Sequence, residues 1–331
     1  MFVTSVTVRV PGKINLQLAV GPLRPDGYHG LVTVFHAVSL FDDVRVTPAK
    51  TDSVTVIGEG AGLVPENADN LALRAVQALR EALASRAARA LGAASAVSAA
   101  TTAGASAGVD TAAGPGGVAV AITKRIPVAG GMAGGSADAA AALVACNELW
   151  GAGLSQQELC EIAGGVGSDV AFPVLGGTAV GRGRGEQLAP ALASPVDFHW
   201  VLAFADGHLS TPAVFRTLDK QRAGREVADP ELSNELMAAL RAGDVDGLGA
   251  ALSNDLQEPA LALFPALRKT LGAGLEAGAR GALVSGSGPT CYFLARDASH
   301  AADLAVALSV AGVCRSVATA AGPAAGACVV A

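Results

Sequence analysis

Apolar and polar residues alternate along the first part of the chain, which is the pattern of β-strands with one buried face. Residues 3–20 predict two strands separated by a turn at Pro11-Gly12, and residues 21–30 predict a polar turn. Further strands are predicted for residues 31–40, 43–48 and 53–57. The N-terminal part of the chain is therefore expected to be rich in strands.

Apolar residues at the spacing of a helix first appear after Asn70. One face of this helix collects Leu71, Ala75, Ala78, Leu79 and Leu83. Later helices are predicted near residues 136–150, 155–164, 211–218, 230–241, 243–252, 271–278 and 299–310. Strands are predicted at residues 118–123, 171–181, 199–204 and 313–318, with a hairpin over 282–294. Because helices and strands mix in both halves, we expect an α+β protein with two domains, residues 1–191 and 192–331.

Residues 92–117 differ from the rest because they are almost entirely Ala, Ser, Gly and Thr. Asp110 is the only charged residue in this stretch. Such a composition buries too little side chain to offset the entropy lost on ordering. We therefore interpret residues 92–117 as a flexible surface insertion in the first domain.

Composition narrows the function classes. Of 331 residues, 51% are hydrophobic and 16% charged, as in a globular protein, and the net charge of −6 argues against a nucleic-acid partner. Neither a signal peptide nor an apolar stretch long enough to span a membrane is evident. The five cysteines form no C-x-x-C pair, which favours reduced thiols. A cytoplasmic enzyme or binding protein, monomeric or weakly homodimeric, is expected.

A glycine-rich loop, Pro127-Val-Ala-Gly-Gly-Met-Ala-Gly-Gly-Ser136, precedes an alanine-rich helix. Its glycines let the backbone approach an anion, and Ser136 could cap the helix. The free N–H groups of the first turn lie at the positive end of the helix dipole, which favours phosphate binding. Without a ligand, the same residues would form an ordinary glycine-rich turn. The chain lacks a P-loop, a dinucleotide fingerprint and the protein-kinase motifs, so any phosphate chemistry needs another architecture.

Three further positions could carry chemistry. Lys13 and Asn15 lie on one face of an apolar strand, where a lysine could act on a substrate or simply protect a sheet edge. Tyr28-His29 could stack on a flat base or pack a polar turn. Asp169 follows a glycine-rich corner and could accept a proton from a hydroxyl group, or serve only as a turn or N-cap residue.

Together these segments resemble the GHMP kinases, which bind ATP with a loop similar to residues 127–136. Within that family the chain resembles members that act on a cytidyl-linked alcohol. The matching segments occur in family order as Pro11-Gly-Lys-Ile-Asn-Leu16, Arg24-Pro-Asp-Gly-Tyr-His29, Gly167-Ser-Asp-Val-Ala-Phe172, Gly181-Arg-Gly-Arg-Gly-Glu186 and Ser285-Gly-Ser-Gly288. The segment that ends at His29 is the most specific, because other GHMP kinases lack it.

The resemblance implies a two-domain GHMP kinase fold with the active site between the domains. It implies ATP- and Mg²⁺-dependent phosphorylation of the 2-hydroxyl of a cytidine diphosphate-linked methylerythritol in the non-mevalonate isoprenoid pathway. Asp169 would be the general base, and Lys13 would keep it ionised and offset charge on the transferred phosphoryl group. Asn15 would contact the substrate near its reacting end.

The resemblance also implies the binding residues. Tyr28 and His29 would receive the cytosine, and Phe215 in Thr211-Pro-Ala-Val-Phe215 would supply a second face for it. Residues 285–288 would help to close the site. ATP would be bound by Pro127, Val128, Ala129, Gly130, Gly131, Met132, Ala133, Gly134, Gly135 and Ser136. The Mg²⁺ ligand is not evident, although Ser136 is a candidate.

The chain departs from the family pattern at Met132-Ala133, where Leu-Gly is commoner, and at Ser168 and Ala171, where Ala and Pro are usual. These changes leave the backbone N–H donors in place. Two other functions stay open. A GHMP kinase for homoserine or mevalonate would leave Tyr28-His29 without a role, and a catalytically inactive binding protein would not need both Lys13 and Asp169.

Overall fold

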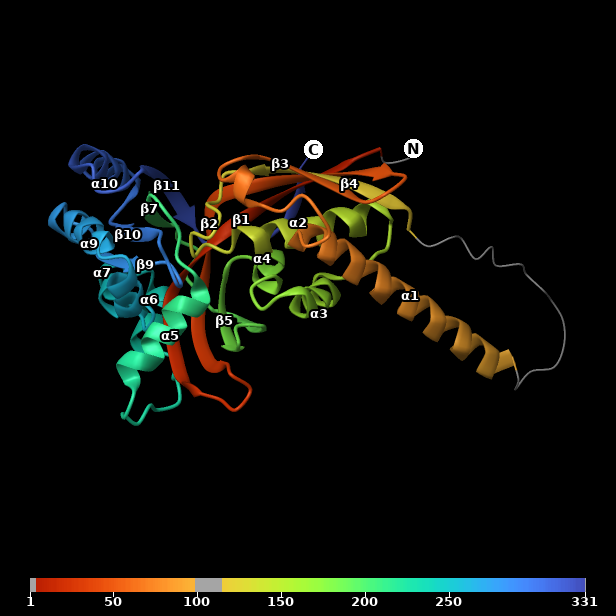
Figure 1. Cartoon of the computed structure of the whole chain (residues 1–331), viewed down its shortest axis with the longest axis horizontal. Coiled ribbons are helices and arrows are strands. Elements are labelled where there is room, and N and C mark those ends of the chain that lie inside the picture. Colours follow the sequence, from red (N-terminus) through yellow and green to blue (C-terminus); the bar gives the residue numbers. More distant parts are fainter. Residues whose placement is uncertain (1–3, 99–114, 331) are drawn as a thin grey trace.

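The computed structural model describes residues 4–98 and 115–330, which form two antiparallel or mixed β-sheets with their helices (Figure 1). The eight-stranded sheet has the order β12-β1-β2-β4-β3, with β5 and β8 attached beside it and β6 paired to β5. Its strands are β1 Val6–Leu23, β2 His29–Ala49, β3 Ser53–Gly58, β4 Gly117–Lys124, β5 Thr178–Gly183, β6 Gln187–Pro190, β8 Ser253–Asn254 and β12 Cys328–Val330. The four-stranded sheet has the order β11-β7-β10-β9, with strands β7 Phe198–Phe204, β9 Gly281–Val284, β10 Cys291–Ala295 and β11 Ser316–Gly322.

The helices lie in two groups, one with each sheet (Figure 1). The first group comprises the short 3₁₀ helix η1 Ala61–Leu63, α1 Leu71–Ser98, α2 Gly134–Leu149, α3 Gln156–Val166 and α4 Ala171–Leu175. The second comprises α5 Thr211–Arg222, α6 Asn234–Ala242, α7 Val245–Ala251, α8 Gln257–Leu263, α9 Ala266–Glu276 and α10 Ala298–Ala311. Among the described residues, none of these helices is both long and apolar enough to cross a bilayer.

Helix α2 packs closely on β1 and β2 because its inner residues are alanines. Ala139 and Ala142 are completely buried, and so is Leu79 of α1, as its helical spacing predicts. Asn70 immediately precedes α1 and caps its N-terminus, because its side-chain oxygen accepts a hydrogen bond from the Ala72 N–H at 2.9 Å. Small side chains bring the helix backbone near the sheet, which places the N-terminus of α2 beside the strands that carry the site.

The predicted turn at Pro11-Gly12 is wrong. β1 runs through both residues, and its register against β2 shifts between them, so that Pro11 pairs with Phe41 and Gly12 with Val38. A proline is tolerated at such a bulge because its missing N–H breaks no regular ladder bond. The predicted strands 31–40 and 43–48 are one continuous strand, β2, because the irregular pairing does not interrupt it. The predicted polar turn over residues 21–30 is limited to residues 24–28.

Three other local predictions need correction or remain open. Residues 171–181 form α4 and then β5 rather than one strand. In the predicted insertion 92–117, α1 continues to Ser98 and β4 begins at Gly117, while residues 99–114 lie outside the described residues. The domain division at 191/192 stays a prediction: it falls between β6 and β7, but β8 and β12 return to the first sheet.

Candidate active site

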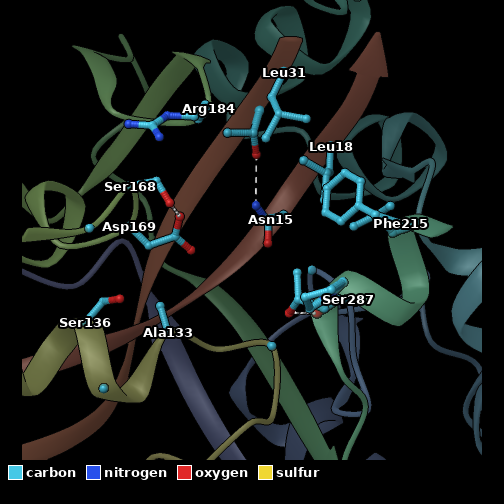
Figure 2. A pocket seen from close by; sticks show the side chains of 18 of the residues that line it. Asn15, Leu18, Leu31, Ala133, Ser136, Ser168, Asp169, Arg184, Phe215 and Ser287 are labelled. Atoms are coloured by element: carbon cyan, nitrogen blue, oxygen red, sulfur yellow. Dashed lines mark hydrogen bonds between the residues drawn. The ribbon is translucent and has the colours of Figure 1, made fainter. Parts of the chain in front are cut away.

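A cleft of about 1190 Å³ opens between the glycine-rich loop, the inner part of β1 and β2, and the start of α5 (Figure 2). Most of the residues singled out in the sequence line it: Lys13, Asn15, Tyr28, His29, Ala129, Gly130, Gly131, Ala133, Gly134, Gly135, Ser136, Asp169, Thr211 and Phe215. Pro127, Val128 and Met132 do not; Pro127 and Met132 are buried beneath the loop. The fold thus collects residues from five distant segments around one cavity.

Lys13 lines this cleft with its side chain almost fully buried. Its Nζ donates hydrogen bonds to Asn15 Oδ1 at 2.7 Å and to the Gly131 carbonyl at 3.0 Å, and lies 3.9 Å from Asp169 Oδ2. Burial lowers the pKa of Lys13, and the Asp169 carboxylate opposes that shift. The burial rules out the alternative of a charge that protects an exposed sheet edge.

Asn15 holds Lys13 in place through a chain of hydrogen bonds. Asn15 Nδ2 donates to Thr33 Oγ1 at 2.8 Å, and the Thr33 hydroxyl donates to the Gln17 carbonyl at 2.7 Å. The Tyr292 hydroxyl donates to the Asn15 backbone carbonyl at 2.6 Å. Both ends of the Asn15 amide are therefore engaged within the protein, although the residue also lines the cleft. Its predicted contact with substrate stays a prediction.

Asp169 occupies the turn Gly167–Val170 immediately before α4. Its carboxylate accepts a hydrogen bond from Ser168 Oγ at 3.2 Å and keeps about a third of its side-chain surface exposed to the cleft. No side-chain capping bond occurs at the start of α4, so Asp169 is not an N-cap residue. In Figure 2, Ser168 and Asp169 lie on one side of the cleft and Phe215 and Ser287 on the other, with Asn15 between them.

Tyr28, His29 and Phe215 form the aromatic end of the cleft, and in Figure 2 Phe215 lies across the cleft from Ala133 and Ser136 of the glycine-rich segment. The His29 ring is buried and stacks on Phe215 of α5, with ring centroids 5.4 Å apart. His29 Nδ1 donates to the Gly21 carbonyl at 2.9 Å, and Nε2 lies 3.1 Å from Asp219 Oδ1. Tyr28 is 55% exposed, with the Arg184 guanidinium 5.4 Å from its ring centroid. Tyr28 thus offers an accessible aromatic surface, whereas His29 packs into the protein.

The glycine-rich loop rests against the turn between β9 and β10. Ser285 Oγ donates to the Gly131 carbonyl at 3.0 Å, and a Cβ added at Gly131 would lie 1.9 Å from the Ser285 carbonyl oxygen. In the same turn, Ser287 Oγ lies 2.8 Å from Thr211 Oγ1 at the start of α5. Only glycine fits at position 131, so the sequence of the loop follows from this close approach.

The start of α2 differs from the sequence prediction. Ala133, not Ser136, precedes the first helical residue, and it adopts the left-handed conformation with φ 58°. Ser136 lies in the first turn and lines the cleft. In the left-handed conformation the Cβ of an alanine comes too close to the following carbonyl oxygen, which costs free energy. Glycine has no Cβ, which explains why it is commoner here in related loops.

Ala133→Gly is therefore expected to raise the free energy of unfolding by about 0.5–1 kcal/mol, because relief of left-handed strain outweighs the added freedom of the unfolded chain. Urea denaturation measures the change. Ala302→Gly in the exposed face of α10 is the matched control and should lower stability by about the same amount. Destabilisation by both substitutions would contradict the argument.

A buried ion cluster that sequence analysis did not identify supports the loop from below. Lys124 at the end of β4 donates to Asp42 Oδ2 at 2.5 Å and to Asp138 Oδ2 at 2.7 Å, and all three side chains are buried. Asp42 Oδ1 also accepts the backbone N–H groups of Arg125 and Ile126. Burial raises the pKa of Asp138 to about 7, against the opposing effect of Lys124. The two carboxylates, against the effect of burial, raise the pKa of Lys124.

Comparison with known proteins establishes the family. The model of the GHMP kinases N terminal domain matches residues 70–177, and that of the GHMP kinases C terminal domain matches residues 236–313. A 4-diphosphocytidyl-2-C-methyl-D-erythritol kinase from Thermobifida fusca is 54% identical over 99% of both chains, and one from Streptomyces coelicolor is 51% identical over 98% of this chain and 99% of its own. The chain belongs to the 4-diphosphocytidyl-2-C-methyl-D-erythritol kinases of the GHMP family. It is a small-molecule kinase.

Solved structures agree with this GHMP kinase assignment. A 4-(cytidine 5'-diphospho)-2C-methyl-D-erythritol kinase superimposes with a TM-score of 0.69 and 31% identity, covering 95% of this chain and 98% of its own. The homoserine kinase from Cytophaga hutchinsonii has the same TM-score at 17% identity, covering 100% of this chain and 98% of its own. The second likeness shows a shared fold only, so the choice of substrate depends on the site.

Other residues of this GHMP kinase line the cleft without a role assigned from sequence, and Arg184 and Asp219 are among them. Asp219 lies one helical turn after Phe215, so both side chains fall on the same face of α5 and reach His29 together. That spacing was available in the sequence. Arg184 belongs to a segment used for the family resemblance, but no local pattern shows that its side chain turns toward Tyr28.

Within the described residues, no group of three or more His, Cys, Asp and Glu is arranged to hold a metal ion. Ser136 in the first turn of α2 and Asp169 are oxygen donors that line the cleft near the loop. So few protein donors suit a Mg²⁺ ion held mainly by nucleotide phosphates and water, since Mg²⁺ commonly keeps several waters. The donors therefore fit a nucleotide-bound Mg²⁺ rather than a metal cage built by the protein.

Proposed function

We propose that this kinase transfers the γ-phosphoryl group of ATP to the 2-hydroxyl of 4-diphosphocytidyl-2-C-methyl-D-erythritol in the non-mevalonate isoprenoid pathway. The main support for this proposal is that Lys13 Nζ lies 3.9 Å from Asp169 Oδ2, in one cleft that the glycine-rich loop and the aromatic residues also line. The names of the relatives support the same substrate. All five cysteines are free thiols, which supports a location in the reducing cytoplasm.

In the proposed reaction, the Asp169 carboxylate accepts the proton of the substrate hydroxyl. The hydroxyl oxygen forms a bond to the γ-phosphorus while the bond between that phosphorus and the β,γ-bridging oxygen breaks, and ADP leaves. Lys13 offsets negative charge on the transferred group. Its bonds to Asn15 and the Gly131 carbonyl fix the ammonium group near both reactants.

ATP binding is proposed at residues 127–136 and the start of α2. The unpaired N–H groups there and the helix dipole favour phosphate oxygens. Because Pro127, Val128 and Met132 do not line the cleft, we expect them to shape the loop and the other seven residues to contact nucleotide. Mg²⁺ bound to ATP would neutralise phosphate charge, with Ser136 as the proposed protein contact.

We infer that the aromatic end of the cleft selects the cytosine. Tyr28 supplies the exposed ring, and Phe215 and Thr211 also line the cleft. Tyr28→Ala is expected to weaken binding of the cytidyl substrate by about 1–3 kcal/mol, the usual loss when base stacking is removed. Steady-state kinetics should show a raised KM for that substrate and an unchanged KM for ATP. An unchanged KM for the cytidyl substrate would argue against stacking.

The deciding experiment is a turnover assay with ATP and Mg²⁺ on 4-diphosphocytidyl-2-C-methyl-D-erythritol, with homoserine, mevalonate and galactose in parallel. Selective turnover of the cytidyl compound is expected. Turnover of another alcohol would keep the Lys13–Asp169 chemistry but reject the role of Tyr28 and His29. ATP binding without turnover of any of them would favour an inactive binding protein.

A further inference from the structure

Arg184 lies at the tip of the hairpin between β5 and β6, beside the reacting end of the cleft. A Cβ added at its neighbour Gly185 would lie 3.7 Å from Asp169 Oδ1 and 3.4 Å from Phe35 Cζ. The Arg184 backbone N–H donates to Glu186 Oε2 at 2.7 Å, which fixes the tip. The hairpin backbone therefore packs next to the proposed general base.

The Arg184 side chain extends from the hairpin to the ring of Tyr28. Its guanidinium lies 5.4 Å from the centroid of the Tyr28 ring, and the residue lines the cavity. Figure 2 shows it above Ser168 and Asp169 on the same wall. None of the ion pairs among residues 4–98 and 115–330 includes Arg184, in contrast to Lys13, whose Nζ is held by Asn15 and Gly131. The cleft thus contains an arginine that has no carboxylate partner among the described residues and lies next to Tyr28.

We propose that Arg184 binds the diphosphate of the cytidyl substrate and so helps to select it. This inference rests on the proposed function. In that substrate the diphosphate joins the cytidine, placed at Tyr28, to the methylerythritol, whose hydroxyl meets Asp169. Arg184 has its guanidinium next to Tyr28, and its hairpin packs beside Asp169. A guanidinium presents a planar fork of N–H donors that suits phosphate oxygens, and stacking on Tyr28 orients the fork.

The test compares two ligands that differ only in the diphosphate. Cytidine 5'-diphosphate and cytidine are titrated calorimetrically into the full-length enzyme, its Arg184→Gln variant and a control, Arg182→Gln. Arg182 is an exposed residue of the same hairpin that does not line the cleft. Arg184→Gln should weaken cytidine 5'-diphosphate about 10- to 100-fold, the usual effect of losing hydrogen bonds to a charged group, and leave cytidine within about twofold. The control should bind both ligands normally.

Kinetics provide an independent readout. Arg184→Gln should raise the KM for the cytidyl substrate by a similar factor, with KM for ATP unchanged, and Arg184→Lys should recover part of the loss because it keeps the charge but not the fork. Equal weakening of cytidine and cytidine 5'-diphosphate would overturn the inference, since Arg184 would then act only by supporting Tyr28. Unchanged binding of both would overturn it as well.

Failure of this inference is distinguishable from failure of the proposed function. If the unaltered enzyme phosphorylates the cytidyl compound and Arg184→Gln has the same KM and the same affinity for cytidine 5'-diphosphate, only the role of Arg184 is rejected. If the unaltered enzyme neither phosphorylates that compound nor binds cytidine 5'-diphosphate, both proposals fall together.

Discussion

Asp169→Asn is expected to lower kcat by about 10²–10⁴, the usual contribution of a general base, while ATP binding stays close to that of the unaltered enzyme. Asparagine keeps the size of the side chain but cannot accept the proton of the attacking hydroxyl. Because the Asp169 side chain is a third exposed and caps no helix, the substitution should leave the fold intact.

The matched control is Asp197→Asn, at an exposed aspartate that does not line the cleft. Its kcat should equal that of the unaltered enzyme. Initial rates with saturating cytidyl substrate give kcat, and calorimetric titration gives ATP affinity. Normal turnover by Asp169→Asn would reject the base assignment, and loss of ATP binding would show that Asp169 acts on the nucleotide instead.

Lys124→Met should lower the free energy of unfolding at neutral pH by about 3–5 kcal/mol, which is the usual loss when one partner of a buried ion pair is removed. Methionine retains most of the lysine volume, so the loss reports charge rather than packing. Asp42 and Asp138 would then lie buried without a cation. A Cβ added at Gly134 would lie only 3.3 Å from Lys124 Nζ, so ATP binding should weaken with stability.

The pH dependence identifies the cause. Burial already raises the pKa of Asp138 to about 7 in the presence of Lys124, and removal of that cation raises it further. A carboxyl whose pKa is raised by folding favours the folded state at low pH and opposes it as the pH increases through the folded pKa. Hence the loss in Lys124→Met should be smaller at pH 5 than at pH 8.

Urea denaturation at both pH values measures these differences. Lys269→Met is the control, because it makes the same substitution at an exposed lysine and should change stability by no more than about 0.5 kcal/mol. A loss of equal size at pH 5 and pH 8 would point to packing as the cause and contradict the charge argument.

The sequence singled out most of the residues of interest that line the cleft, but not the buried ion cluster of Lys124, Asp42 and Asp138. Lys13 and Asp169 stand in short motifs whose chemistry is local, so both could be singled out without coordinates. Asp42 continues the inward alternation of Val44 and Val46, whereas Asp43 faces outward and pairs with Arg9 and Arg125. Alternation does not show that Lys124 and Asp138 meet Asp42, because that contact depends on how β4 and α2 pack against β2.

The errors in secondary structure have similar physical causes. A proline next to a glycine usually marks a turn, but here a bulge absorbs both residues within β1. The apolar run after Asp169 is too short for its periodicity to distinguish a strand from a helix. Its residues Ala171–Leu175 form the helix α4. The position of Arg184 could not be predicted from sequence, because its contact with Tyr28 depends on how the β5–β6 hairpin lies relative to the turn between β1 and β2.

The pairing of β12 with β1 has a consequence for synthesis on the ribosome. Thr7 lies opposite Val330 and Arg9 opposite Cys328, so one edge of the first sheet consists of residues translated at opposite ends of this sequence. Chains usually fold from the N-terminus as they emerge, but here the edge of β1 that β12 covers stays open until β12 has left the exit tunnel. Nascent chains stalled before Cys328 should therefore expose an unpaired strand edge, the kind of surface that chaperones recognise and that promotes aggregation.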